Sequence, residues 1–596
     1  MEITPAKRKL SLLMDQAYQG KLALPDFQRE FVWSREEVAD LLRSVLRQYF
    51  IGSFLLLQSD PQRPPFAPVF LRGAKSNLKV PEPDLLVLDG QQRLSALLYA
   101  LSAPDMNLKD SSQRRWFFID LKLLLTDLYE DEVVFDRSKK ELEGFLEKEV
   151  QYRERILPCP ALLTSKGFYD WRDGLDDWLR DKEPDNHKLF REKWRDTWTR
   201  SITDFQSFEV PVVELPRIEE GDSNSIGTVC AIFEKLNSTG VELSVYDLLT
   251  ARLYRSGKRL HDLWDSACRE HKLLAEWSKG KADTNKFGVL VLRTLALLRG
   301  LDPKPRILID LSPVRFEEDW RRAAAAMETA IVLISHMDED GFGVFEKKWL
   351  PGFGLLPVLA ALRSEIETRK LGPEARSDLR RWYWSNVFLE RYSSAVESKS
   401  RKDYSELLKR WTENDKNEPA VFTEAKARIG SAGFTVRESA SYASAVYSGV
   451  FALLVLNRAR DWRRGESIQL QDLEDHHLFP RAYLNRHGLE KKSDVNSIVN
   501  RTLISDETNR KIRDQAPADY LASREIFPSG ATPALLEPHF ISESVLELMR
   551  RAKDSLTEPE VKALFESFRS ARERLIIAEI QKACGIAPVS TTTGGV

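Results

Sequence analysis

The sequence predicts an α+β protein of several domains: an α/β N-terminal domain, an α-helical middle, and a C-terminal strand–strand–helix segment embedded in helices. Three observations predict this class. The chain has 596 residues, which is more than one hydrophobic core usually serves, so about two to four domains are expected. Short apolar runs alternate with amphipathic helices near the N-terminus, and helical periodicity alone follows from about residue 256. Two further strand-like runs and a short helix occur near the C-terminus.

The N-terminal domain is predicted from elements that follow one another along the chain. Ser34 to Glu37 has the form of a capping box, in which a hydroxyl and a carboxylate satisfy the free amides of a helix start. Phe54 to Leu57 and Leu85 to Leu88 are apolar runs typical of buried strands, and Phe208 to Leu215 is a third. The second run is followed by a polar turn and a helix. The buried stripe expected on that helix is Leu94, Leu97, Leu98 and Leu101.

The domain boundaries follow from the change in periodicity and composition. We expect an N-terminal domain over 1–255, interrupted by a charged, tryptophan-rich helical insertion at about 122–205. An α-helical domain is expected over 256–440. The C-terminal domain and its helices are expected over 441–585, and the tail over 586–596 is expected to be disordered.

Composition restricts the class of protein. The net charge is −2, so a protein that coats DNA through a large positive excess is not indicated, and any contact with nucleic acid must come from local patches. The four cysteines lie far apart, which argues against a structural zinc site and for a reducing compartment. No apolar run approaches the roughly 20 residues that span a bilayer. No secretion signal is recognised, so we expect a cytoplasmic protein without membrane contact.

One polar cluster surrounds the second N-terminal strand. Its turn is Asp89 to Arg93, and the earlier segment Leu24 to Trp33 contributes two more polar side chains. Glycine after a strand lets backbone approach a ligand, and a helix N-terminus favours an anion. A guanidinium grips phosphate oxygens in a forked geometry. A common turn and ordinary core packing would explain the same residue types. The candidate nucleotide-binding residues are Gln28, Arg29, Asp89, Gly90, Gln91, Gln92 and Arg93.

A second cluster lies near the C-terminus. The segment Leu473 to Pro480 carries the adjacent pair His476 and His477, and a strand over Val499 to Ser505 precedes a short helix over Asp506 to Gln515. Histidine serves as a general base near neutral pH, and a divalent metal on imidazole and oxygen ligands stabilises charge on a phosphate. Adjacent side chains on an extended segment point to opposite sides. One histidine can therefore hold a metal while the other faces water.

The spacing of this cluster resembles the HNH, or ββα-metal, nucleases. In that family a metal ligand directly precedes the catalytic histidine, and proline follows the histidine by three residues. Counting back from Pro480 implies that His477 is the base and His476 the ligand. The family's loop-fixing and second metal-ligand asparagines match Asn500 and Asn509. Asp475 stands one position before the usual ligand, so its role as ligand or as partner of a ligand stays open, as does the choice of Mg²⁺, Mn²⁺ or another divalent ion.

The N-terminal cluster, together with Phe233 to Leu249, resembles the GmrSD-like restriction proteins, whose N-terminal domain belongs to the ParB/sulfiredoxin-like group. The resemblance covers about the first 250 residues and again about 440–555. It implies a type IV, modification-dependent endonuclease that cuts phage DNA, with a nucleoside triphosphate bound or hydrolysed by the N-terminal domain. The oligomeric state stays open, with a homodimer as one option.

Two other functions fit the same residues. The chain would serve as a nucleotide-switched DNA-binding or regulatory module if the C-terminal site were vestigial, or as an NTPase that senses a DNA modification and nicks DNA when triggered. Metal dependence separates the binder from the nuclease. One more cluster, Arg458 to Arg464 with Trp462, lies just before the histidines and is interpreted either as part of a DNA track or as a solvated helix face.

Overall fold

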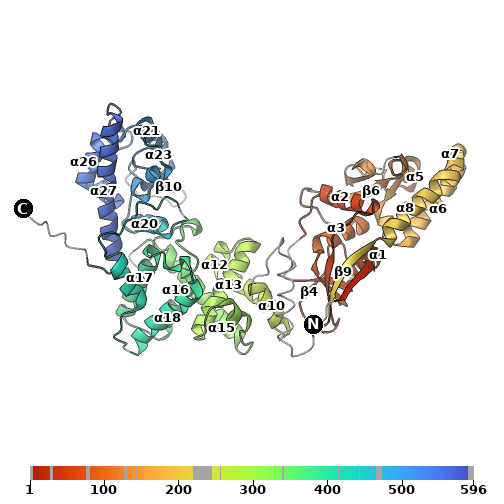
Figure 1. The fold of residues 1–596 in the computed structure, drawn as a ribbon, viewed down its shortest axis with the longest axis horizontal. Coiled ribbons are helices and arrows are strands. Elements are labelled where there is room, and N and C mark those ends of the chain that lie inside the picture. Colours follow the sequence, from red (N-terminus) through yellow and green to blue (C-terminus); the bar gives the residue numbers. More distant parts are fainter. Residues whose placement is uncertain are drawn as a thin grey trace, which may run out of the picture. The chain divides into compact units, whose positions relative to one another are not determined.

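The computed structural model describes residues 4–26, 28, 31–75, 81–126, 131–142, 144–218, 245–255, 257–338, 341–413, 415–441, 443–464 and 473–587. The chain divides into two compact units, Met1–Leu260 and His261–Val596. The ribbon in Figure 1 shows the larger sheet in the first unit and mainly helices in the second. The mixed α/β class, with an N-terminal sheet domain and a helical remainder, is thus confirmed. The middle helices and the C-terminal segment, expected as two domains, belong to one compact unit.

The first unit is built on a six-stranded mixed sheet. Its strand order is β1-β9-β3-β5-β2-β4. β3 pairs parallel with β9 and antiparallel with β5, and β5 pairs parallel with β2. The central strands are apolar and buried along almost their whole length, as strands covered by helices must be. The strands are β1 (Thr4–Lys9), β2 (Leu22–Pro25), β3 (Phe54–Gln58), β4 (Pro68–Val69), β5 (Leu85–Asp89) and β9 (Glu209–Leu215).

Helices bury their apolar faces against this sheet in one core. The predicted capping box is present: Ser34 accepts a hydrogen bond from the Glu37 amide, and the Glu37 carboxylate accepts one from the Ser34 amide. The stripe predicted for the helix after Leu88 is buried on α3. The helices of the unit outside the insertion are α1 (Leu10–Tyr18), α2 (Arg35–Leu46), α3 (Gln91–Ser102) and α10 (Val245–Arg255).

The tryptophan-rich insertion differs from the prediction. It is mostly helical, but it also contributes two short strands to a three-stranded antiparallel sheet in the order β7-β6-β8. Trp171 and Trp198 are buried, so these tryptophans build a core rather than a surface. The elements are β6 (Arg115–Asp120), β7 (Val134–Ser138), β8 (Ile156–Pro158), α4 (Leu121–Thr126), α5 (Lys148–Glu154), α6 (Ser165–Lys182), α7 (Pro184–Leu189) and α8 (Arg195–Ser207).

The first part of the second unit is helical, as predicted. Three long helices, α13, α15 and α16, pack against one another, and α17 packs against α19, α20 and the C-terminal helix α27 (Glu558–Ala583). No described helix combines the length and the apolar character that crossing a membrane requires. The helices are α11 (Leu260–Glu270), α12 (Lys272–Trp277), α13 (Lys281–Leu298), α14 (Pro305–Ile309), α15 (Phe316–Ser335), α16 (Leu355–Thr368), α17 (Pro373–Phe388), α18 (Val396–Thr412), α19 (Ala420–Arg428) and α20 (Ala445–Leu456).

The end of the second unit contains a two-stranded antiparallel sheet, β10 with β11, followed directly by α23. The predicted order of strand, strand and helix is therefore present. A separate hydrophobic core around Trp462, Phe479 and Tyr520 supports it. The elements are β10 (Leu473–His477), α21 (Arg481–Arg486), α22 (Lys492–Val495), β11 (Arg501–Ser505), α23 (Asp506–Ile512), α24 (Pro517–Ala522), α25 (Pro533–Leu536), α26 (Glu543–Arg551) and α27 (Glu558–Ala583).

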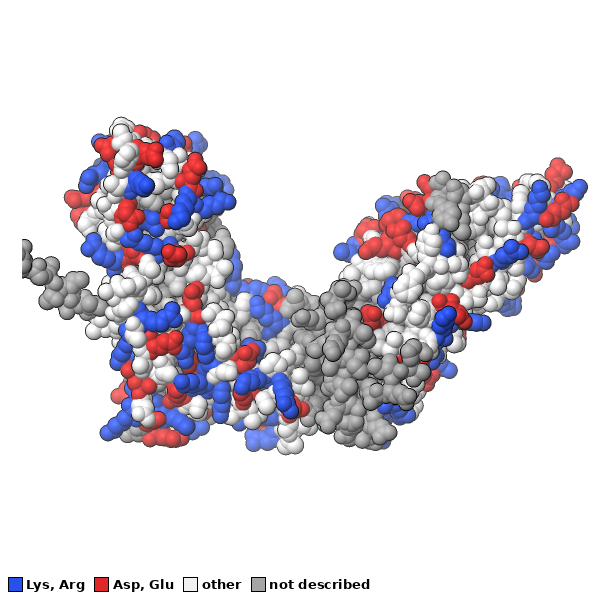
Figure 2. Space-filling model, viewed as in Figure 1, with Lys and Arg blue, Asp and Glu red and all other residues white. Residues whose placement is uncertain are grey.

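Charged side chains of both signs are interspersed on the face of the molecule in Figure 2. This distribution agrees with the net charge of −2. A site for a polyanion must therefore be sought in a local arrangement of side chains.

Candidate active site

The two histidines lie at the end of β10, in an antiparallel pair with β11. His476 is opposite Thr502 in the register, and His477 is opposite Arg501. Successive side chains of a strand point to opposite faces. Asp475 and His477 therefore share one face of the hairpin, and His476 points to the other.

His476 meets Asn509 on α23. Its Nδ1 atom lies 2.7 Å from the Asn509 Oδ1 atom. The His476 side chain is almost completely buried, with the Trp462 ring edge-on at 5.8 Å between centroids. Its Nε2 atom is buried and has no hydrogen-bond partner in the described part of the chain. Burial lowers the pKa of His476 to about 3, so the imidazole is neutral, which is the form that binds metals.

His477 is oriented by a residue that the sequence did not indicate. Its Nε2 atom lies 3.0 Å from the Asn496 Oδ1 atom, which also accepts a hydrogen bond from Arg501 at 2.9 Å. Because that oxygen only accepts, Nε2 carries the proton and Nδ1 keeps its lone pair. Burial, and then the positive charge of Arg501, lower the pKa of His477 to about 4. The ring is therefore neutral and has one basic nitrogen.

Asn500 fixes the chain as it leaves β10. Its Oδ1 atom accepts a hydrogen bond from the Phe479 amide at 2.8 Å. Its Nδ2 atom donates to the carbonyl oxygens of Phe479 and Val495 at 3.1 and 3.0 Å. The side chain is fully buried. Asn500 therefore holds the loop after the histidines against the start of β11.

Asp475 is turned away from His476. Its carboxylate accepts a hydrogen bond from the Tyr447 hydroxyl and forms an ion pair with Arg501 at 3.1 Å. It lies on the His477 face of the hairpin, where Arg501 connects it to Asn496. The arrangement joins Asp475 to the surroundings of the base and does not bring it to the pair His476 and Asn509.

The start of α23 is held by Asp461, another residue that the sequence did not indicate. The buried Asp461 carboxylate accepts hydrogen bonds from the Ser505 amide and the Thr508 hydroxyl, both at 2.9 Å. Burial opposes ionisation of this carboxyl, but the hydrogen bonds outweigh burial and lower its pKa. Because Ser505 is also the N-cap of α23, Asp461 positions the helix that carries Asn509. Asp461, Asn496 and Tyr447 have no motif that would have revealed them, since each acts across a stretch of intervening chain.

The described residues contain no group of three His, Cys, Asp or Glu side chains placed to hold a metal ion. A divalent ion would thus rest on the imidazole of His476 and the amide oxygen of Asn509, with water and phosphate as its other ligands. The amide oxygen only accepts, so Nδ1 of His476 carries the proton in this contact, and an ion held by both side chains would replace the hydrogen bond, with the neutral imidazole in its other tautomer. The donors fit one ion. Imidazole suits manganese and the later transition metals at least as well as magnesium.

Some side chains of the predicted nucleotide-binding cluster form hydrogen bonds within the first unit. Gln28 donates to the Leu88 carbonyl oxygen at 2.8 Å, and Gln92 accepts from the Val32 amide at 3.0 Å. Both side chains tie the segment after β2 to the turn between β5 and α3. Arg29 lies outside the described residues.

Arg93 is held by backbone and by a carboxylate. Its guanidinium donates to the carbonyl oxygens of Ile51 and Ser53, the second at 3.0 Å, and lies 3.7 Å from Asp89. Gly90 precedes α3 with φ of 91°, and a Cβ atom there would lie 2.2 Å from the Phe54 ring. The turn therefore needs glycine to bring backbone close to β3, whereas Arg93 holds the loop before β3.

The comparisons identify the family. A sequence model described as "GmrSD restriction endonuclease, N-terminal domain" matches residues 10–254. The chain is also 32% identical to "Uncharacterized protein MJ0686" of Methanocaldococcus jannaschii, over 97% of this chain and 99% of that protein. The chain belongs to the GmrSD-like family. In this GmrSD-like protein the family model covers the strands of the larger sheet other than β1, and the turn from Asp89 to Arg93. The similarity to the archaeal protein extends over almost the whole chain.

Two of the segments singled out in the sequence differ in whether the family model covers them. The motif from Phe233 to Leu249 falls within the matched region, but residues 233–244 lie outside the described residues, and α10 carries only its end. The histidine segment lies beyond the family model, so its interpretation rests on its own geometry and on the spacing of its residues.

Proposed function

We propose that this GmrSD-like protein is a metal-dependent DNA endonuclease of the HNH type, with its reaction centre at β10, β11 and α23. The single observation that carries the proposal is the orientation of His477. The neutral imidazole of His477 is hydrogen-bonded through Nε2 to Asn496, beside the positive charge of Arg501. The side chain of the preceding residue, His476, contacts Asn509. Membership of a restriction-endonuclease family supports DNA as the substrate.

The residues of the site have different roles in phosphodiester hydrolysis. His477 accepts a proton at Nδ1 from the water whose oxygen attacks phosphorus, and the bond from phosphorus to the leaving oxygen breaks. The resulting imidazolium keeps its Nε2 hydrogen bond to Asn496. Arg501 offers a positive charge beside the phosphate, and Asn500 keeps the loop after His477 in place. A divalent ion on His476 and Asn509 would supply charge neutralisation on the phosphate and the leaving oxygen.

The metal is proposed to be Mg²⁺ or Mn²⁺. The pair of one imidazole and one amide oxygen supports a preference for Mn²⁺, because Mg²⁺ favours oxygen donors. Asp475 is excluded from the proposed ligands, since its carboxylate is engaged with Tyr447 and Arg501 on the other face.

We further propose that a nucleoside triphosphate binds the N-terminal unit and controls cleavage of modified phage DNA. The resemblance to the GmrSD-like proteins implies this assignment, and the glycine turn and the start of α3 directly after β5 support it. Of the predicted residues, Asp89 and the amides from Gly90 onward are the proposed contacts. Arg93 is proposed to act indirectly, because its guanidinium already holds the carbonyl oxygens of Ile51 and Ser53.

The test of the function uses wild-type protein, plasmid DNA and modified phage DNA. Cleavage is measured with Mg²⁺, with Mn²⁺ and after chelation by EDTA, each with and without nucleoside triphosphates. Cleavage that requires the ion, and that responds to triphosphate, is expected. Binding of DNA that persists without cleavage under every condition would favour the regulatory module. Triphosphate hydrolysis that rises with modified DNA, accompanied only by nicking, would favour the modification-sensing NTPase.

A further inference from the structure

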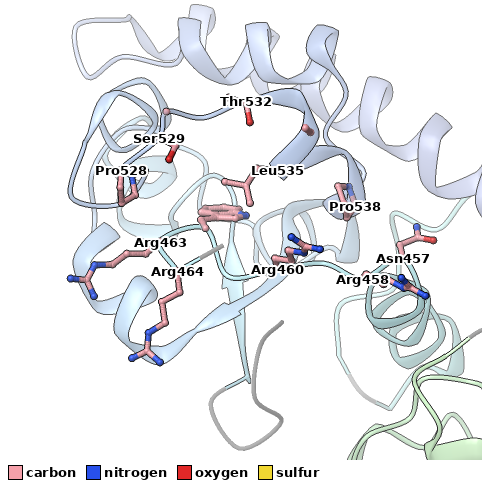
Figure 3. A pocket seen from close by; sticks show the side chains of 13 residues that line it. Asn457, Arg458, Arg460, Arg463, Arg464, Pro528, Ser529, Thr532, Leu535 and Pro538 are labelled. Atoms are coloured by element: carbon pink, nitrogen blue, oxygen red, sulfur yellow. The ribbon is translucent and has the colours of Figure 1, made fainter. Parts of the chain in front are cut away.

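A pocket of about 490 Å³ opens beside the candidate active site, within the second unit. Its walls come from the segment before β10 and from the loop and helix around α25 (Figure 3). Ligand pockets of small molecules have volumes of a few hundred to about 1,000 Å³, so this space suits a single nucleotide rather than an ion. The lining residues are Asn457, Arg458, Arg460, Trp462, Arg463, Arg464, Pro528, Ser529, Gly530, Thr532, Ala534, Leu535 and Pro538.

The charge of the pocket is positive. Four of the described lining residues are arginines, and none of the described lining residues is Asp or Glu. Arg463 and Arg464 share one carboxylate, that of Glu507. In Figure 3 their guanidinium groups point away from Leu535, whereas that of Arg460 lies on the side of Leu535 and Pro538. Arg460 is therefore the arginine best placed to meet an anion inside the pocket.

The pocket also has an apolar side and hydroxyl groups. Pro528, Leu535 and Pro538 form apolar surface, and Ser529 and Thr532 add hydroxyls at the edge shown in Figure 3. A phosphate ion alone would use the arginines and leave the apolar surface without a partner. A nucleotide uses both, because its base is largely apolar and its phosphate is anionic.

Trp462 connects the pocket to the active site. Its ring is stacked with Tyr520 and with Phe527, at interplanar angles of 13° and 25°. Its indole Nε1–H is buried without a hydrogen-bond partner in the described part of the chain, although buried donors are normally satisfied. The same side chain meets His476 edge-on. A lining residue thus offers a spare donor and directly contacts the proposed metal ligand.

We propose that this pocket binds a nucleotide unit, with its phosphate on Arg460 and an acceptor of the nucleotide on the Trp462 indole. If the chain is an endonuclease as proposed above, the nucleotide belongs to the DNA strand next to the phosphate that is cut. The pocket then fixes the register of the strand relative to His476 and His477. The same chemistry would accept a free nucleotide, and the experiment separates the two sources.

The experiment measures binding by the full chain in EDTA, so that it does not depend on cleavage. A labelled DNA duplex is titrated over a range of salt concentrations with wild type, Arg460→Gln, Trp462→Phe and the control Arg551→Gln, an exposed arginine of α26 outside the lining. Binding of labelled dAMP is measured in parallel. Arg460→Gln is expected to reduce the slope of log K against log salt by about one, the value for one lost phosphate contact. Trp462→Phe keeps an aromatic ring and is expected to weaken binding about two- to tenfold, as for one lost hydrogen bond.

The outcomes distinguish a nucleotide of the DNA strand from a free nucleotide, and they test the pocket separately from the endonuclease function. Duplex binding that weakens in both pocket variants, with no dAMP binding, supports a nucleotide of the DNA strand. Loss of dAMP binding in the same variants supports a free nucleotide in the pocket. The proposal is overturned if both variants bind as the wild type and Arg551→Gln do, or if the wild type binds neither probe. Failure of the wild type to cut DNA in the presence of metal would instead remove the endonuclease function and leave this binding result intact.

Discussion

The Nδ1 atom of His476 lies 2.7 Å from the Oδ1 atom of Asn509, although the two residues are 33 positions apart along the chain. The two side chains come from β10 and from α23, and they meet because β11 pairs with β10 and leads directly into the helix. The hydrogen bond brings an imidazole nitrogen and an amide oxygen into contact, and an ion held by both side chains would take its place, with the imidazole in its other neutral tautomer.

Substitution of Asn509 is expected to change the metal requirement more than DNA binding. Asn509→Ala removes one of the two proposed protein ligands, so the Mn²⁺ concentration for half-maximal cleavage should rise by about tenfold or more. Asn509→Asp supplies a carboxylate oxygen and should lower the Mg²⁺ concentration that is needed. The metal dependence of cleavage is measured for both, with Asn417→Ala, an exposed asparagine of the same unit, as the control. Equal metal requirements for Asn509→Ala and wild type would contradict the ligand assignment.

Removal of the Asn500 side chain is expected to release the loop that follows the histidines. Asn500→Ala leaves the buried Phe479 amide and two carbonyl oxygens without partners, at a cost of about 2–4 kcal/mol in local stability. Hydrogen exchange in peptides that cover β10 and α21 should therefore accelerate. Peptides of the first unit serve as the internal control. Unchanged exchange at Phe479 would show that Asn500 does not hold this loop.

The buried residue His539 is expected to make the stability of the second unit depend on pH. Its Nδ1 and Nε2 atoms contact the Thr502 hydroxyl and the Arg460 carbonyl oxygen at 2.8 and 2.9 Å, and burial lowers its pKa to about 4. In the unfolded chain His539 takes up a proton at about pH 6.5, whereas in the folded chain it does so only near pH 4. This residue therefore does not change the free energy of unfolding above pH 6.5. It lowers that free energy as the pH falls from 6.5 to 4. The slope is at most about 1.4 kcal/mol per pH unit.

The variant His539→Gln does not titrate in this range, so it should flatten the pH dependence of urea unfolding between pH 6.5 and 4 by about one proton. His336→Gln, at an exposed histidine of the same unit, should leave the pH dependence as in wild type. A His539→Gln profile that is parallel to the wild-type profile would show that this residue is not buried in its neutral form.

Gly52 is expected to stabilise the loop that Arg93 holds. Gly52 has φ of +90°, and a Cβ atom there would lie 1.9 Å from the Arg93 Nη1 atom. Gly52→Ala should therefore cost about 1–3 kcal/mol and accelerate hydrogen exchange around the start of α3. Gly280→Ala is the matched control, because Gly280 has φ of +93° and a Cβ atom there would meet nothing within 4 Å. Equal losses in the two variants would mean that backbone strain alone, and not the Arg93 contact, sets the requirement.

The sequence predicted those features that depend on local pattern. The Ser34 capping box, the apolar strands β3 and β5 and the order of β10, β11 and α23 all follow from spacing within a few residues. The short strands β7 and β8 were not predicted, because three to five residues carry too little periodicity in a charged stretch.

The sequence could not predict contacts that are closed by tertiary structure. Asn496 orients His477 from a loop, and no motif distinguishes it from other polar loop residues. Arg93 was expected to bind phosphate, but in the structure its guanidinium donates hydrogen bonds to two carbonyl oxygens about 40 positions earlier in the chain. The direction in which a side chain points across the fold decides both cases, and spacing along the chain does not contain that information.

The most direct test of the central claim is the cleavage rate of His477→Ala under single-turnover conditions with saturating Mn²⁺. His336→Ala is measured beside it as a matched substitution at an exposed histidine. The account predicts that His477→Ala loses at least about a hundredfold in rate, the usual contribution of a general base, and that it still binds DNA as wild type does. Cleavage by His477→Ala at the wild-type rate would contradict the assignment of His477 as the base and, with it, the proposed reaction centre.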